Sequence, residues 1–267
     1  MLKFISFGSG SSGNCYYIYS ESESLLIDAG IGLRTLKKYF KDRALPFNIA
    51  NCLITHDHTD HVKSIGGICK ECGTTVYATR EVHQGIERNY CVKYKIPQER
   101  KVYVEKQKQF SIGNFVITPF NVPHDSSDNV GYLIEYEGVR LCIVTDAGET
   151  NSEIGGYISK ATHLILESNY DKEMLLEGPY PEHLKARIRG GRGHLSNTEC
   201  GETLIKYATP NLQHVWLCHL SAENNHPELA RKTIESCLRN NGIIAGSDFK
   251  LDVLKRRTPS ETYILIP

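Results

Sequence analysis

The sequence predicts a protein of the α/β class, in which strands and helices alternate along most of the chain. Short apolar runs, such as residues 49–54 and 139–144, have the length and composition of buried strands. Longer segments between such runs, for example residues 33–41, are suited to helices. Residues 28–30 and 146–148 both read Asp-Ala-Gly at the end of a predicted strand, which indicates two similar β-rich halves whose loops converge on one site.

Composition and length narrow the class further. The 267 residues are ample for a large core, and because no linker or low-complexity stretch divides them we expect one domain over residues 1–267. Lys plus Arg and Asp plus Glu both number 31, so any nucleic acid would have to be held by a local basic patch. Residues 1–7 resemble a strand rather than a signal peptide, and no apolar run is long enough to cross a bilayer. We therefore expect a soluble, cytoplasmic protein that has no membrane partner.

The elements are expected in the following order. Apolar or alternating runs bounded by turn residues predict strands at residues 3–7, 15–20, 25–27, 49–54, 74–78, 102–105, 115–123, 132–136, 139–144, 163–167, 215–218 and 263–266. Helices are expected at residues 33–41, from 62 onward, and at 80–89, 174–192, 196–207 and 228–240. Ser196 with Glu199 forms a capping box that begins the helix at 196, whereas the helix at 174–192 is expected to have irregular ends.

The most informative stretch is the heptapeptide at residues 55–61, which lies between a buried strand and a helix. Alternate side chains of an extended segment share a face, so His56 and His58 can bind one ion. Asp60 and His61 follow as the chain turns and can face a second ion. Imidazole and carboxylate ligands without a thiolate suit zinc, manganese or iron. A polar surface turn is the alternative, but three histidines and an aspartate at this spacing favour a metal site.

The pattern His-x-His-x-Asp-His resembles the metal motif of the metallo-β-lactamase superfamily. This resemblance implies a four-layer αββα sandwich with a dinuclear site at one edge. It also implies a later histidine, aspartate and histidine, each ending a strand, and His124, Asp146 and His219 occupy such positions. By the same resemblance, one metal is held by His56, His58 and His124, the other by Asp60, His61 and His219, and Asp146 bridges the two.

Resemblance to this superfamily also implies the chemistry. Two ions about 3.5–4 Å apart can share a hydroxide whose pKa is lowered towards neutrality, and this metal-bridging hydroxide is the expected nucleophile. Asp60 and His194 are the expected catalytic residues. His194 begins a helix where the tRNA-processing and phosphodiesterase branches carry a non-ligand histidine that serves the phosphate or leaving group; a solvent-facing residue is the alternative. Asp28 is expected to brace the histidine loop, with helix capping as a compatible role. His163 begins a strand and is expected to be structural.

Three stretches, residues 8–14, 193–197 and 219–225, closely resemble the bacterial YycJ (WalJ) family, and the resemblance runs from end to end. It implies a metal-dependent DNA exonuclease that degrades from the 5′ end and is linked to DNA repair. For the glycine-rich segment 8–14 alone, a flexible hairpin loop is the alternative. The residues expected to contact the substrate are Ser9, Ser11, Ser12, Asn14, Arg189, Arg192, Ser196, Asn224 and Asn225.

Three functions compete at this point: a phosphodiesterase acting on DNA, another enzyme on the same scaffold, or a non-catalytic binding subunit. The second group includes an RNA nuclease, a small cyclic phosphodiesterase and a thioesterase. The intact ligand set argues against the third. Four cations favour a polyanion over a thioester, with a solvated helix face as the alternative; they are Lys185, Arg187, Arg189 and Arg192. DNA is favoured over RNA by the family resemblance, although no motif reads a 2′-hydroxyl. The single pair Cys69 and Cys72 is a weak signal for zinc or redox chemistry.

Overall fold

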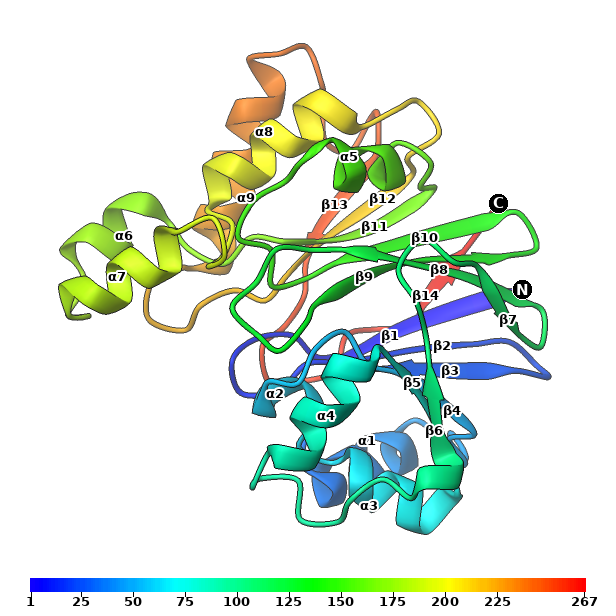
Figure 1. Ribbon diagram of the computed structural model, residues 1–267. Helices are drawn as coiled ribbons and strands as arrows, with labels where there is room; N and C mark the ends of the chain where they lie inside the picture. Colours follow the sequence, from blue (N-terminus) through cyan, green and yellow to red (C-terminus); the bar gives the residue numbers. More distant parts are fainter.

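The computed structural model describes residues 1–267 and contains two seven-stranded sheets that face each other, with helices on both outer faces (Figure 1). In spatial order the first sheet consists of β14 (Tyr263–Leu265), β1 (Leu2–Gly8), β2 (Cys15–Tyr19), β3 (Ser24–Ile27), β4 (Asn51–Leu53), β5 (Thr75–Ala78) and β6 (Lys101–Tyr103). The second consists of β13 (Lys250–Val253), β12 (His214–Cys218), β11 (His163–Glu167), β10 (Val139–Val144), β9 (Val130–Tyr136), β8 (Phe115–Asn121) and β7 (Phe110–Ile112). The expected four-layer αββα sandwich is confirmed.

The helices form the two outer layers. The first sheet is accompanied by α1 (Leu33–Asp42), α2 (Thr59–Val62), α3 (Ile65–Cys72), α4 (Arg80–Arg88) and the 3₁₀ helix η1 (Gln98–Arg100). The second is covered by α5 (Ser152–Ile158), α8 (Asn197–Tyr207) and α9 (Pro227–Arg239). Two short helices, α6 (Lys172–Glu177) and α7 (Glu182–Arg189), project together from one side of the body (Figure 1).

Three apolar clusters hold the four layers together. The middle cluster lies between the sheets, where the ring of Phe4 on β1 lies 4.8 Å from that of Trp216 on β12. Two outer clusters fill the spaces between each sheet and its helices, with Phe40 of α1 in one and Ile234 of α9 in the other. Burial of each such side chain contributes roughly 1.5–3 kcal/mol, so these clusters hold the sheet edges that carry the polar loops.

Strand direction brings those polar loops to one edge of the sandwich. Strands β3, β4 and β5 run parallel in the first sheet, as do β10, β11, β12 and β13 in the second. Asp28 and His56 therefore follow β3 and β4 at the same edge, and Asp146 and His219 follow β10 and β12 opposite them. A bridge between His56 and Asn129 joins the edges of the two sheets directly.

One glycine determines how closely the loops approach. A Cβ added to Gly30, just after β3, would lie 1.6 Å from the carbonyl oxygen of Asp60. Only glycine therefore allows the loop after β3 to pack against the backbone of the metal motif.

Several elements differ from those expected. The helix predicted at 174–192 is divided into α6 and α7, and Pro179 and Pro181 stand in the interruption because proline cannot continue a helical hydrogen-bond pattern. The helix after the metal motif is divided into α2 and α3. Strands β7 and β13 and helix α5 were not predicted; both strands lie at sheet edges, where periodicity is weak. The capping box at Ser196 is confirmed. The structure contains no helix that is long and apolar enough to span a membrane.

Candidate metal centre

Backbone strain marks the strand ends that carry the site. Asp28, Asp146 and His219 have φ values of 58°, 54° and 55°, which place three non-glycine residues in the left-handed region. Each such residue costs on the order of 1–3 kcal/mol and persists only where the surrounding structure requires it. At each of these positions the side chain contacts another member of the site: Asp28 and Asp146 contact His61, and His219 contacts Asp146.

The structure brings the seven predicted ligands into neighbouring groups. Ligand atoms of His56, His58 and His124 lie within 4.8 Å of one another, and the same holds for Asp60, His61 and His219. Asp146 stands between the groups. Its Oδ2 lies 3.2 Å from His61 Nε2 and its Oδ1 lies 3.7 Å from His124 Nε2.

The donor set fits metal ions. His56 Nε2 is buried and has no hydrogen-bond partner. The carboxylates of Asp28, Asp60, Asp146 and Glu167 form ion pairs only with histidines and never with lysine or arginine. Such uncompensated negative charge is costly in a buried site, and bound cations would offset it.

His61 shows the same excess of negative charge. Burial alone would lower the pKa of His61, but the carboxylates of Asp146, Asp28 and Asp60 outweigh burial and raise it to about 10. The site therefore favours positive charge at this position.

Asp28 contacts the metal motif at two points. Its Oδ1 accepts a hydrogen bond from the Thr55 backbone N–H at 2.8 Å, and its Oδ2 lies 2.7 Å from His61 Nδ1. A proton on Nδ1 leaves His61 Nε2 as an acceptor, which is the state that binds metal. In this structure the Asn14 amide nitrogen lies 2.8 Å from Nε2 of His61.

Glu167, at the end of β11, is a site residue that the sequence analysis missed. It is fully buried, and its Oε1 lies 2.9 Å from both His194 Nδ1 and His219 Nδ1. Its Oε2 accepts hydrogen bonds from the backbone N–H groups of Ala147 and Leu195. A carboxylate at the end of a predicted buried strand was a signal that could have identified it, because such a group requires partners.

His194 lies at the open side of the cluster and belongs to neither of these two ligand groups. Its ring does lie within 4.8 Å of ligand atoms of Asp146, Glu167 and His219, which together form a further group. Its side chain is 19% exposed, whereas the side chains of His61 and His219 are at most 3% exposed. Burial alone would lower the pKa of His194, but the adjacent Glu167 carboxylate outweighs burial and raises it. Because Glu167 holds Nδ1, and Nε2 has no hydrogen bond in the structure, Nε2 is the nitrogen that can serve a substrate.

The residues expected to contact substrate divide by exposure. Ser11, Ser12, Arg189 and Arg192 are exposed. The others are buried, and the list is Ser9, Asn14, Ser196, Asn224 and Asn225.

Three of the buried residues have evident internal roles. Ser9 Oγ accepts a hydrogen bond from the His219 backbone N–H at 2.9 Å. Ser196 forms the capping box of α8. Asn225 Nδ2 donates to the backbone carbonyls of Ser168 and Asn169, at 3.0 Å each. We therefore assign these three to holding the loops of the site rather than to touching a substrate.

The basic segment does not form a free helix face. Lys185 is buried and donates to the Leu176 carbonyl oxygen at 2.6 Å, which ties α7 to α6. Arg187 forms an ion pair with Asp125. Arg192 donates through Nη2 to the His124 carbonyl oxygen at 2.9 Å. The exposed Arg189 makes no ion pair, so it is the cation of this segment most available to an external anion.

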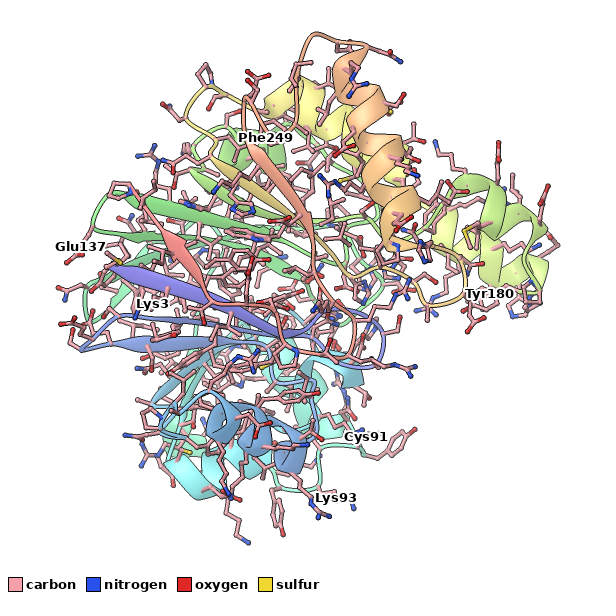
Figure 2. The ribbon with its side chains drawn as sticks, turned by 180° about the vertical axis from the view of Figure 1, so that it is seen from behind. Lys3, Cys91, Lys93, Glu137, Tyr180 and Phe249 are labelled. Atoms are coloured by element: carbon pink, nitrogen blue, oxygen red, sulfur yellow. The ribbon has the colours of Figure 1, made fainter.

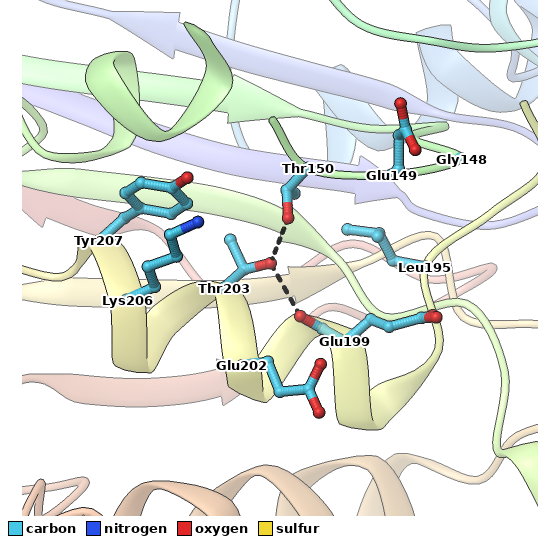
Figure 3. A pocket seen from close by; sticks show the side chains of 9 residues that line it. All are labelled: Gly148, Glu149, Thr150, Leu195, Glu199, Glu202, Thr203, Lys206 and Tyr207. Atoms are coloured by element: carbon cyan, nitrogen blue, oxygen red, sulfur yellow. Dashed lines mark hydrogen bonds between the residues drawn. The ribbon is translucent and has the colours of Figure 1, made fainter. Parts of the chain in front are cut away.

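A cavity of about 290 Å³ lies beside the site without including any proposed ligand (Figure 3). It is bounded by α8 and the loop that follows Asp146, and Thr150 and Thr203 form a hydrogen bond across it (Figure 3). Glu149, Glu199 and Glu202 line it with a single lysine, so its charge disfavours phosphate.

The two cysteines of the Cys-x-x-Cys pair are free thiols. Burial raises the pKa of Cys69 to about 12, which makes its thiol unreactive. Cys69 and Cys72 donate to different backbone carbonyls, those of Thr74 and Phe47.

Comparison with known proteins agrees with this geometry. A family described as "Beta-lactamase superfamily domain" matches residues 23–219. The chain therefore belongs to the metallo-β-lactamase superfamily. Among solved structures, the metallo-β-lactamase fold protein YhfI from Bacillus subtilis has a TM-score of 0.70 and 18% identity, and the match covers 97% of this chain and 98% of YhfI. This similarity shows the fold alone.

Curated relatives identify the branch. The chain is 30% identical to exodeoxyribonuclease YycJ of Bacillus anthracis over 261 residues, 97% of this chain and 98% of the relative. It is 31% identical to exodeoxyribonuclease WalJ of Streptococcus pneumoniae over 93% of each chain. Within the superfamily, the chain is thus a YycJ/WalJ-like protein.

Proposed function

We propose that this protein is a metal-dependent phosphodiester hydrolase that acts as a DNA exonuclease. The observation that carries the proposal is the position of His194 beside a group of metal-ligating side chains, held by a buried carboxylate and open to solvent. A proton donor next to a metal centre fits the cleavage of an ester with a poor leaving group. The names of the two curated relatives support DNA as the substrate.

We propose that the centre holds two divalent ions, of zinc, manganese or iron. His56, His58 and His124 would hold one, Asp60, His61 and His219 would hold the other, and Asp146 would contact both. When bound, the ions supply an activated water as nucleophile and neutralise negative charge on the phosphate.

The protein's own residues carry the remaining steps. Nε2 of His194 gives a proton to the departing oxygen, and Glu167 holds the opposite side of that ring in place. Asp28 keeps His61 in the tautomer that presents Nε2. The side chain of Asp60 is 24% exposed, so it can face a substrate as well as the proposed ligands.

The finer features of the proposal follow the family. We propose cleavage from the 5′ end, a role in DNA repair, and one catalytic domain over residues 1–267. Free thiols at all nine cysteines support a cytoplasmic location, where thiols stay reduced.

A substrate panel tests the proposal. The protein, loaded separately with zinc, manganese or iron, is offered DNA and RNA labelled at either end, a cyclic dinucleotide, bis-p-nitrophenyl phosphate and a thioester. We expect stepwise release of nucleotides from DNA and little thioester hydrolysis. Hydrolysis of RNA or of the cyclic substrate in preference to DNA would replace the proposed substrate, and thioester hydrolysis alone would remove the phosphodiesterase proposal. Asp146→Asn, measured in parallel, controls for contaminating nucleases.

A further inference from the structure

We propose that Tyr90, in the turn after α4, provides a stacking surface for an unpaired base of the substrate strand beside the metal centre. This inference rests on the proposed function and adds a binding residue to it. Tyr90 is 91% exposed, more than any other large hydrophobic side chain of the protein, and makes no hydrogen bond. A tyrosine ring left almost entirely in water has a free π-face on which a base can stack.

The turn that carries Tyr90 is anchored on both sides. Val92 and Ile96 are buried in the apolar cluster beneath α3 and α4. The Cys91 backbone N–H donates to Asn89 Oδ1 at 3.0 Å, and Lys95 Nζ donates to the Asn89 carbonyl oxygen at 3.0 Å. Because these neighbouring residues are held, the backbone at Tyr90 is already ordered, and little backbone entropy is lost when a base stacks on the ring.

The same turn is bonded to the metal motif. Asn89 Nδ2 donates to the Asp57 carbonyl oxygen at 3.0 Å and lies 3.3 Å from Thr59 Oγ1. Asp57 and Thr59 flank His58, one of the proposed ligands. Tyr90 is thus one residue away from a side chain that contacts the loop of the metal site.

The charge around Tyr90 suits a phosphate backbone. Arg88, Lys93 and Lys63 are exposed and form no ion pair. The nearby carboxylate of Glu87 forms an ion pair with Lys101. Cys91 and Lys93 lie on the same side of the molecule as Tyr180, which stands between α6 and α7 (Figure 2). A strand bound at Tyr90 would have the cations of this segment beside its phosphates.

An exonuclease that cleaves without sequence preference needs a way of binding that accepts every base, and stacking on an aromatic ring provides it. Every base has a π-face, so a ring combined with nearby cations holds single strands regardless of sequence. Base-edge recognition would stall the enzyme at disfavoured bases, whereas stacking permits stepwise movement.

The test compares wild type with Tyr90→Ala and Tyr90→Trp on metal-loaded protein with single-stranded oligonucleotides. Tyr94→Ala is the matched control, because Tyr94 lies four residues away and is 53% exposed, but Lys70 Nζ lies over its ring, 4.3 Å from the centroid. We expect Tyr90→Ala to raise KM roughly 5- to 100-fold and to leave kcat nearly unchanged. Tyr90→Trp should restore KM, and Tyr94→Ala should match wild type. Anisotropy of a labelled oligonucleotide, measured with chelated protein, should show the same order of affinities.

An abasic scan locates the stacked base. One abasic position is moved along the oligonucleotide; wild type should lose affinity at one position, and Tyr90→Ala should show no further loss there. An unchanged KM in Tyr90→Ala, or equal losses for both proteins at every position, would overturn the stacking role. A joint fall in kcat that tryptophan does not restore would also overturn it and would show that the turn orders the metal motif. Wild type that hydrolyses no oligonucleotide at all would instead defeat the proposed function.

Discussion

Glu167 Oε1 lies 2.9 Å from His194 Nδ1, and this contact couples a fully buried carboxylate to a partly exposed histidine. Because Gln keeps the shape of Glu but not its charge, Glu167→Gln should weaken the orientation of His194. We expect activity on DNA to fall roughly 10–100-fold, the usual effect of a lost partner behind a site residue. The double variant with His194→Ala should lose less than the two single losses combined, and its loss beyond that of His194→Ala reports the contact of Glu167 with His219. Glu21→Gln, a change at an exposed position, serves as the control. If the losses of the two single variants add fully in the double variant, Glu167 and His194 act independently.

His194 and His219 should behave differently although both contact Glu167. His219→Ala is expected to lose bound metal as well as activity, because its side chain is buried among the proposed ligands. His194→Ala should keep its metal and lose rate roughly 10²–10⁴-fold, the range for a positioned proton donor. The loss should shrink for bis-p-nitrophenyl phosphate, whose leaving group needs no protonation. Equal losses with good and poor leaving groups would show that His194 positions the phosphate.

Elemental analysis of protein purified without chelator should approach two divalent ions per chain. Asp60→Ala should remove mainly one of them, since Asp60 belongs to only one of the two ligand groups, with His61 and His219. One ion per chain in wild type, unaffected by Asp60→Ala, would contradict a dinuclear centre.

Arg189 and Arg192 should differ in their effects. Arg189→Ala should weaken binding of long DNA and flatten its dependence on salt by about one unit of slope, because it removes one phosphate contact. Arg192→Ala should also reduce metal content, since its guanidinium holds the carbonyl of His124. The exposed Arg239 on α9 gives a matched control. Loss of metal in Arg189→Ala would show that Arg189 supports the metal centre and does not simply contact phosphate.

His163 should make the fold sensitive to acid. Burial, with a smaller effect of His214, lowers the pKa of His163 to about 4. Between this value and the ordinary value near 6.5, the unfolded chain binds a proton that the folded one does not. Stability should therefore fall as pH falls through this window, by at most roughly 1.4 kcal/mol per pH unit from this group. Urea unfolding of His163→Asn at several pH values should show a shallower fall; parallel curves would mean that His163 titrates normally.

Local patterns were sufficient for much of this protein. Residues 55–61 present four ligand-type side chains in one extended segment, so their proximity follows from strand geometry. Apolar runs identified most strands because burial on both faces requires them. The four-layer arrangement followed from the resemblance, and the structure confirms it. The ligand roles of the seven residues stay predictions, although the structure places them together.

Only the tertiary structure decided which polar residues face the open side of the site and which are buried and hold its loops in place. Glu167 meets His194 across 27 positions of sequence, and Ser9 meets the backbone of His219 across 210. Such contacts depend on how the two sheets pack, and the local hydrophobic pattern of the sequence does not predict them. The sequence by itself determined that four ligand-type side chains lie together in residues 55–61, because their spacing is a property of one segment. Packing decided the burial of Ser9 and Asn225, the partners of Arg187 and Arg192, and the exposure of Tyr90, because each depends on neighbours distant in the chain.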